Sequence, residues 1–235
     1  MKNAHEVALL FDAKAQSWDS KYRANGPLAY RAAAFSALLD GRVRRGAAVL
    51  DFGGGTGSIA TALAQQGYQM TVCDVSDRML AAGKRLYAGQ AIEWLLLPAE
   101  WQRIPFANGT FDAIIASSVL EYLQDVENVL AECGRILRAG GALIFSVPNP
   151  SHPRRRLERL LRPLAILGLA MPPVRHLPKI GDYLRYLRVS RARFRAADWE
   201  RRAAGAGLQA VKPDPGMPEL ETSKEMMYLV FKRPI

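Results

Sequence analysis

The stretch VLDFGGGTG, residues 49–57, decides the fold. An apolar run ends in Asp51 and passes into a loop, Gly53–Gly57, that holds four glycines in five residues. Glycine permits positive φ angles and lets a ligand approach the backbone without a Cβ in the way. In parallel sheets, such loops follow the carboxyl ends of strands, and ligands bind there. The stretch therefore predicts a ligand held against backbone at a strand end.

Two nucleotide-binding loops compete to explain these glycines. A phosphate-binding P-loop ends in Gly-Lys-Ser/Thr, whereas this loop ends in Gly57-Ser58 without a lysine, which excludes that class. The dinucleotide fingerprint G-x-G-x-x-G maps to Gly53, Gly55 and Ser58, so its third glycine is missing. Asp74 lies 19 residues beyond Gly55, where a carboxylate can accept hydrogen bonds from both ribose hydroxyls. Together these residues indicate an adenosine ligand and leave NAD and other adenosine compounds open.

The remainder of the chain alternates apolar strands with helices. Strands are predicted at 47–52, 69–74, 91–97, 111–117, 142–148, 208–212 and 225–233, and helices at 3–18, 27–39, 58–67, 76–87, 125–138, 151–173 and 197–206. This alternation predicts a doubly wound α/β fold with a seven-stranded, mostly parallel sheet. Because no helix separates the final two strands, the last strand is expected to run antiparallel to its neighbour.

Four segments follow one another along this pattern: VLDFGGGTG, VCDVS (72–76), LLLPAEWQRIPFANGTFDAIIASSVLEYL (95–123) and LRAGGALIFSVPNP (137–150). In order and spacing they resemble the motifs of class I S-adenosylmethionine-dependent methyltransferases, in particular the small-molecule branch called type 11. The resemblance implies S-adenosyl-L-methionine as the cofactor. It also implies one methyltransferase domain over 1–235, with a helical cap (1–40), a cofactor-binding core (41–150), an Arg-rich lid or insertion (151–196) and a C-terminal helix with strands (197–235).

The resemblance also implies roles for individual residues. The backbone of the glycine loop approaches the methionyl part of the cofactor, Asp74 takes the ribose, and Ser117 brings its carbonyl near the cofactor's amino group. The full set of cofactor-binding residues implied is Asp51, Gly53, Gly54, Gly55, Asp74, Val75, Ala99, Glu100 and Ser117. One departure is Pro98, which stands where the family usually has an acidic residue. In the cap, Trp18 and Tyr22 are candidates to close over the cofactor.

The expected chemistry is direct in-line transfer of a methyl group, which needs alignment and the handling of one proton. The chain lacks the (Asn/Asp/Ser)-Pro-Pro-(Tyr/Phe) loop typical of base-methylating enzymes, because Ser117-Ser118-Val119-Leu120 stands there. The expected acceptor is therefore O or N of a small-molecule or lipid-like compound. His152, just after the fifth strand, is the candidate catalytic base. An NAD(P)-dependent oxidoreductase and a non-catalytic cofactor-binding domain remain as alternatives.

The net charge of +10 is concentrated in one segment. Residues 1–150 hold 14 basic and 14 acidic residues, whereas 151–202 hold 14 basic residues, 13 of them Arg, against 4 acids. Residues 151–173 read as an amphipathic helix with leucines at helical spacing among arginines. Three interpretations stay open for 151–195: a lid with its leucines in the core, a peripheral contact with an anionic membrane, and nucleic-acid binding, the last being disfavoured.

The composition limits the other classes of protein. The sequence contains no run of 18 apolar residues, so no membrane-spanning helix is predicted. Two cysteines in apparent elements of secondary structure indicate buried thiols and a cytoplasmic setting, with or without peripheral contact with the inner face of the membrane. No Cys/His spacing suits zinc, so no metal is expected. No feature of the sequence indicates an oligomeric state.

Overall fold

The computed structural model describes residues 2–23, 25–170, 178–212 and 225–235. The helices are α1 (Lys2–Asp12), α2 (Ala15–Trp18), η1 (Asp19–Lys21), α3 (Tyr30–Leu39), α4 (Ser58–Ala64), α5 (Asp77–Leu86), η2 (Leu120–Tyr122), α6 (Val126–Ile136), α7 (Pro153–Ala170), α9 (Pro178–Val189) and α10 (Ala196–Gly205). The strands are β1 (Ala48–Phe52), β2 (Gln69–Asp74), β3 (Ile92–Leu96), β4 (Phe111–Ser117), β5 (Leu137–Pro148), β6 (Gln209–Ala210) and β7 (Met226–Lys232).

The strands form one sheet in the order β3-β2-β1-β4-β5-β7-β6. Strands β1 to β5 pair in parallel, and β7 pairs antiparallel with both β5 and β6. The predicted doubly wound seven-stranded sheet with an antiparallel last strand is therefore confirmed. The order reverses at β1 and β4, so the loops after these two strands diverge and leave room for a ligand.

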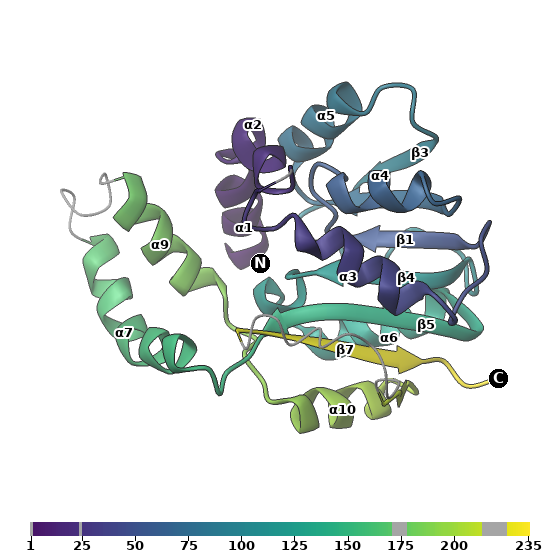
Figure 1. Cartoon of the computed structure of the whole chain (residues 1–235). Coiled ribbons are helices and arrows are strands. Elements are labelled where there is room, and N and C mark those ends of the chain that lie inside the picture. Colours follow the sequence, from purple (N-terminus) through teal and green to yellow (C-terminus); the bar gives the residue numbers. More distant parts are fainter. Residues whose placement is uncertain (1, 24, 171–177, 213–224) are drawn as a thin grey trace.

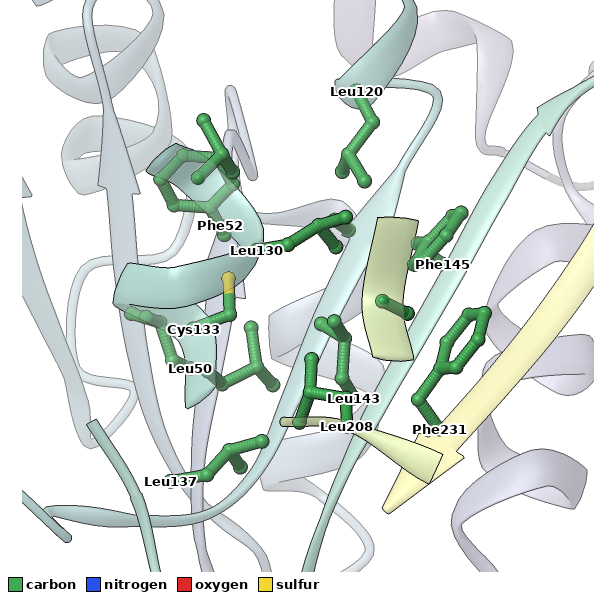
Figure 2. Packing of buried hydrophobic residues seen from close by; sticks show 14 of the residues in the cluster. Leu50, Phe52, Leu120, Leu130, Cys133, Leu137, Leu143, Phe145, Leu208 and Phe231 are labelled. Atoms are coloured by element: carbon green, nitrogen blue, oxygen red, sulfur yellow. The ribbon is translucent and has the colours of Figure 1, made fainter. Parts of the chain in front are cut away.

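Helices cover both faces of the sheet (Figure 1). Side chains of a strand alternate between faces, so Val49 packs with α3 and α4 while Leu50 packs with α6 and α10. Figure 2 shows the second of these clusters, where Leu130 and Cys133 of α6 meet the sheet side chains Leu50 and Phe145. These buried apolar side chains, each contributing about 1.5–3 kcal/mol, hold the strand ends in place.

The ends of several helices differ from the prediction. The helix expected over 3–18 is broken into α1 and α2 by a turn at Ala13-Lys14, where the Lys14 N–H donates to the Phe11 carbonyl at 2.9 Å. The helix expected over 76–87 begins at its cap, where the Ser76 hydroxyl accepts from the Met79 N–H at 3.1 Å. The strand expected at 142–148 begins earlier, at Leu137, and its pairing with β4 is interrupted by a shift of register.

The Arg-rich segment forms a helical hairpin of α7 and α9 beside the sheet (Figure 1). α9 packs between α1 and α7, which leaves α7 outermost. α7 continues through Pro163. Residues 171–173, with which the predicted helix ends, lie outside the described residues. No helix in the described ranges is long and apolar enough to cross a membrane.

The orientation of α7 departs from the lid interpretation. That interpretation puts the leucines in the core, but Leu157, Leu160 and Leu167 are 55%, 72% and 64% exposed. With Leu161, they form one outward face of the helix, here called the leucine face. The opposite side carries Glu158, which is 1% exposed. α7 therefore turns its polar side to the protein and its leucines to solvent.

Candidate functional site

The loop after β1 has backbone angles that only glycine adopts readily. Gly53 has φ +69°, and a Cβ there would lie 2.5 Å from Cγ2 of Val119. A Cβ on Gly54 would lie 2.6 Å from Cγ of Asp51. Both positions therefore require glycine, because a side chain would meet the walls of the site. The Gly53 N–H donates to the Cys73 carbonyl at 2.7 Å, which ties the loop to the end of β2.

Asp74 links the glycine loop to the second strand. Its Oδ2 accepts from the Gly55 N–H at 2.9 Å, and its Oδ1 accepts from the Ser76 N–H at 2.8 Å. Burial raises the pKa of Asp74 to about 6, against these backbone hydrogen bonds. A carboxylate offers about four acceptor positions, so both oxygens retain capacity for ligand hydroxyls.

Asp51 is the most unusual carboxyl group of the loop. It is 1% exposed, and neither oxygen has a hydrogen-bond partner among the described residues. Burial, and then the charge of Asp74, raise the pKa of Asp51 to about 7. Two such carboxyls beside a bare glycine loop form a site suited to a cationic ligand.

The N-terminal helices close one side of this site. The Ser76 hydroxyl donates to Asp12 Oδ1 at 2.6 Å, and the Ser58 hydroxyl donates to Asp19 Oδ1 at 2.9 Å. These contacts hold the cap against α5 and α4. They bring Trp18 Nε1 to 3.6 Å from the position that a Cβ would occupy on Gly55.

A cavity of about 580 Å³ lies between the strand ends, the cap and the α7–α9 hairpin. Its walls include all nine residues predicted to bind the cofactor: Asp51, Gly53, Gly54, Gly55, Asp74, Val75, Ala99, Glu100 and Ser117. Trp18 and Tyr22 of the cap also line it. The structure therefore brings together predicted residues that lie as far apart in the sequence as Asp51 and Ser117, which are separated by 66 positions.

Aromatic side chains form a continuous wall of this cavity. Phe11 lies edge-to-face on Trp18 with ring centroids 5.4 Å apart and on Tyr122 at 5.3 Å. Tyr122 in turn contacts Tyr186 at 6.3 Å, and Tyr186 stacks on Tyr183 at 6.1 Å. All five line the cavity, here called the aromatic wall, which runs from the glycine loop to the helical hairpin.

Glu121 lies at the end of the aromatic wall. It is 2% exposed, and its Oε2 accepts hydrogen bonds from the Ser190 hydroxyl and, at 3.4 Å, from the Tyr186 hydroxyl. Burial raises the pKa of Glu121 above its ordinary value, against the Ser190 hydrogen bond and the charges of neighbouring arginines. Arg155 donates to the Tyr186 oxygen at 2.8 Å and so connects Glu121 to α7.

Glu158 of α7 is the second carboxylate of the hairpin. Its oxygens accept from Arg155 Nη1 at 2.9 and 3.0 Å, from Arg193 Nη1 at 2.8 Å and from the Tyr183 hydroxyl at 3.1 Å. Burial opposes ionisation, but the hydrogen bond and charge of Arg155, then the charge of Arg193, hold the pKa of Glu158 below its ordinary value. This buried network fixes α7 on α9.

His152, the predicted catalytic base, lies apart from these groups. It stands in the turn between β5 and α7, where its backbone N–H donates to the Asn149 carbonyl at 3.1 Å. Its Nδ1 is buried and has no partner among the described residues. His152 is not among the residues that line the cavity.

Sequence reasoning missed several polar residues of the cavity. Arg31 of α3 is 8% exposed, its Nη1 donates to the Ser117 hydroxyl at 3.0 Å, and its Nε has no partner in the described part of the chain. A lone arginine in the apolar run AYRAAAFSALL was the available signal. For Glu121 the signal was an acid in the loop that follows β4.

Comparisons with known proteins agree with this geometry. A family model described as "Methyltransferase domain" matches residues 50–145. A demethylmenaquinone methyltransferase of Thermobifida fusca is 32% identical over 164 residues, which cover 68% of this chain and 68% of that protein. The chain belongs to the class I S-adenosylmethionine-dependent methyltransferases. S-adenosylmethionine is accordingly its cofactor.

Other relatives of this methyltransferase match a smaller share of their length. A ubiquinone/menaquinone biosynthesis C-methyltransferase UbiE of Desulfotalea psychrophila is 40% identical over 105 residues, covering 43% of this chain and 42% of that protein. A demethylmenaquinone methyltransferase of Tropheryma whipplei is 34% identical, covering 66% and 63%. The chain thus spans less than two thirds of the length of these two relatives.

Solved structures share the methyltransferase fold at low identity. A methyltransferase from a Haloferax volcanii complex with the Trm112 activator has a TM-score of 0.67 at 18% identity, covering 96% of this chain and 98% of that chain. The magnesium protoporphyrin IX methyltransferase of Synechocystis with bound SAH has a TM-score of 0.58 at 18% identity, covering 86% and 82%.

The residues at the loop fit the cofactor of this methyltransferase family. S-adenosylmethionine carries a sulfonium and an ammonium charge, and the unpartnered oxygens of Asp51 provide a negative group without a counter-charge. The narrow space at Gly53 and Gly54 suits a ligand that lies directly on backbone.

Proposed function

We propose that the chain transfers a methyl group from S-adenosylmethionine to a ring carbon of a hydroxylated aromatic acceptor of the quinol type, with an apolar tail. The names of the relatives, demethylmenaquinone methyltransferase and UbiE C-methyltransferase, support this acceptor class. The proposal moves the acceptor atom from the oxygen or nitrogen expected from the sequence to carbon. The oxygen and nitrogen products remain outcomes of the test described below.

The aromatic wall is the observation that carries this proposal. Phe11, Tyr122 and Tyr186 present ring faces and edges along the cavity between the glycine loop and Glu121. Offset and edge-to-face contacts stabilise a planar ring by about 0.5–1.5 kcal/mol per pair beyond its area burial. Apolar neighbours such as Val7 and Leu28 also line the cavity and suit an apolar tail.

Glu121 is proposed as the proton acceptor. S-adenosylmethionine supplies an electrophilic methyl group, so the chain has to activate the ring. Glu121 takes the proton of the ring hydroxyl as the neighbouring ring carbon forms its bond to methyl and the S–CH₃ bond breaks. The methylated carbon then loses its hydrogen as a proton to water, which restores the aromatic ring, and Glu121 returns its own proton to the ring oxygen, so one proton is released overall. A raised pKa brings this carboxyl nearer to working pH, as general-base catalysis requires.

The cofactor-binding residues are proposed as the sequence implied them. Backbone of Gly53–Gly55 holds the methionyl part, Asp51 matches its positive charge, and Asp74 accepts from the ribose hydroxyls. Val75, Ala99, Glu100 and Ser117, which line the same cavity, complete the adenine and amino-group contacts. Arg31 joins this set through its hydrogen bond to the Ser117 hydroxyl.

A peripheral contact with an anionic membrane is also part of the proposal. The outward leucine face of α7, flanked by exposed Arg156 and by Arg154, has the composition of an interfacial helix. Such a contact would place the cavity near a bilayer that holds a lipid-like acceptor.

A product analysis tests the function. The enzyme is incubated with methyl-labelled S-adenosylmethionine and short-tailed naphthoquinol or benzoquinol, and the labelled product is identified by mass spectrometry and NMR. Methyl on ring carbon is expected. Methyl on oxygen, or transfer to an amine probe in place of the quinols, would overturn the proposed acceptor.

Two matched variants test the base. Glu121→Gln should lower kcat by roughly 10²–10⁴-fold, as loss of a positioned base does, while S-adenosylhomocysteine binding measured by calorimetry stays within about threefold. Partial recovery of the rate in Glu121→Asp, with a shifted pH profile, distinguishes catalysis from packing. His152→Ala tests the histidine expected from the sequence: if its loss lowers kcat and that of Glu121 does not, the base is assigned to the wrong residue.

A further inference from the structure

A second hollow of about 330 Å³ lies between α7 and the segment that leads into α10. Four arginines line it, Arg156 and Arg159 from α7 and Arg193 and Arg195 from the segment before α10. The remaining lining residues are Pro150, Ser151, Phe194 and Asp198. This set is called the arginine cleft.

The positive charge of the arginine cleft is largely uncompensated. Arg156, Arg159 and Arg195 form no ion pair with any carboxylate of the described ranges. Asp198, the acid in the lining, accepts hydrogen bonds from the Arg201 guanidinium and, at 3.3 Å, from the backbone N–H of Arg195. Three arginines without a carboxylate partner among the described residues, beside an Asp198 that is already paired, create a site that favours a multiply charged anion.

Arg193 is the arginine of the cleft that is fixed by other residues. Its side chain is 12% exposed, its Nη1 donates to Glu158 at 2.8 Å and its Nε donates to the Ser190 hydroxyl at 3.1 Å. Its Nη2 is buried and has no partner among the residues that the structure describes. Arg193 therefore contributes a guanidinium that Glu158 and Ser190 hold in place.

Phosphate is the anion that this arrangement suits. Guanidinium groups match phosphate oxygens with paired N–H donors, and several of them together bind one group of high charge density. The first turn of α10, a ten-residue helix, borders the same hollow at Arg195 and Asp198 and adds its positive end. A single carboxylate would leave most of these donors unused.

The position of the cleft on α7 indicates the source of the phosphate. Arg156 and Arg159 belong to the same two turns of helix as Leu157 and Leu160, which are 55% and 72% exposed. A soluble phosphate compound gives no role to outward leucines, whereas a phospholipid offers a phosphate and acyl chains side by side. A nucleic acid would likewise leave the leucines in water.

We propose that the arginine cleft binds the phosphate of a phospholipid headgroup at a bilayer surface while the leucine face enters the acyl region. This inference rests on the membrane contact proposed above and is independent of the methyl acceptor. It assigns the contact to a defined group of donors rather than to the general charge of the Arg-rich segment.

Vesicle sedimentation with the full chain tests the site. Vesicles of phosphatidylcholine with and without phosphatidic acid are compared for the parent, for Arg156→Gln/Arg159→Gln/Arg195→Gln, and for Arg44→Gln/Lys84→Gln/Arg85→Gln. The control triple removes the same charge from exposed residues outside the α7–α10 region. Binding to phosphatidic acid vesicles should weaken on the order of 100-fold in the cleft variant and less than about threefold in the control.

Two results would overturn the inference. Equal weakening in both triple variants would mean that only general charge attracts the protein. Saturable calorimetric binding of inorganic phosphate or of a short RNA to the cleft, with vesicle binding unchanged in the cleft variant, would assign the site to a soluble phosphate or a nucleic acid. S-adenosylhomocysteine binding to each variant reports that the fold is intact, so a negative vesicle result leaves the methyltransferase proposal standing.

Discussion

The sheet region (48–148) and the α7–α9 hairpin (153–189) use the same residue types in opposite ways. In the sheet region Leu50 and Leu130 are fully buried, whereas Leu160 on α7 is 72% exposed. In the hairpin the buried side of α7 carries Glu158 and Arg155 instead. The comparison teaches that helical periodicity in α7 defines two faces but does not say which one the protein covers. The sheet region is stabilised by apolar burial, and the hairpin by a buried ion network.

The largest expected effect comes from breaking that network. Glu158→Gln leaves Arg155 and Arg193 buried without their counter-charge and should lower the free energy of unfolding of the hairpin by about 3–5 kcal/mol. Hydrogen exchange of α7 and α9, with urea unfolding of the whole chain, measures it. Glu200→Gln on the exposed side of α10 is the matched control and should stay within about 0.5 kcal/mol. Similar protection of α7 in parent and Glu158→Gln would show that the hairpin is held by other contacts.

The second prediction compares leucines directly. Leu130→Ala removes a fully buried side chain of α6 and should lower the free energy of unfolding by about 2–5 kcal/mol. Leu160→Ala, the same substitution on the leucine face, should change it by less than about 0.5 kcal/mol. Chemical denaturation of both variants measures the difference. Equal losses would place Leu160 in a packed interface and contradict the orientation of α7.

The carboxyl groups of the cofactor loop and of the hairpin should change the free energy of unfolding with pH in opposite directions. Asp51 and Asp74 hold their protons up to about pH 7 and about pH 6 in the folded chain, against an ordinary pKa of 3.8. Between pH 3.8 and these raised pKa values, the folded state binds more protons than the unfolded state. The free energy of unfolding therefore falls as pH rises from about 4 to 7. Glu158, with a lowered pKa, stabilises the fold above its ordinary value of 4.5 and loses that contribution as pH falls through its lower folded pKa.

Asp51→Asn tests the loop's part of this behaviour. Removing the buried charge should raise stability at pH 7.5 by about 2–4 kcal/mol and flatten the fall between pH 4 and 7. Thermal unfolding at several pH values measures it, with the exposed Glu200→Gln as the matched control. An unaltered slope in Asp51→Asn would mean that Asp51 is not the group that titrates. S-adenosylhomocysteine binding should be weaker in Asp51→Asn, because the ligand's positive charge loses its partner.

The sequence predicted the parts of the molecule in which local pattern and tertiary packing agree. Apolar strands followed by glycine at 53–55 specify a sheet edge that binds a ligand, and this edge is where Asp51 and Asp74 meet. The pattern did not reveal Glu121, because its partners Tyr186 and Ser190 lie at least 65 residues away and belong to another helix and loop. The position of His152 after a strand predicted that it lies near the chemistry; in the structure it stands in the turn after β5 and is not among the residues that line the cavity, so its catalytic role stays a prediction.

The smallest expected effect is on membrane contact by a single leucine. Leu160→Asn should weaken binding to vesicles that contain phosphatidic acid by about tenfold, since a leucine at an interface contributes roughly 1.5 kcal/mol. Leu9→Asn on α1, where Leu9 is 55% exposed, is the matched control and should leave vesicle binding within about twofold. Sedimentation at several salt concentrations separates the two contributions: the loss in Leu160→Asn should persist at high salt, whereas that of an arginine variant should fade as charges are screened. If Leu9→Asn weakens binding as much as Leu160→Asn, the contact is spread over the surface, and the outward leucines of α7 no longer distinguish the hairpin from the sheet region.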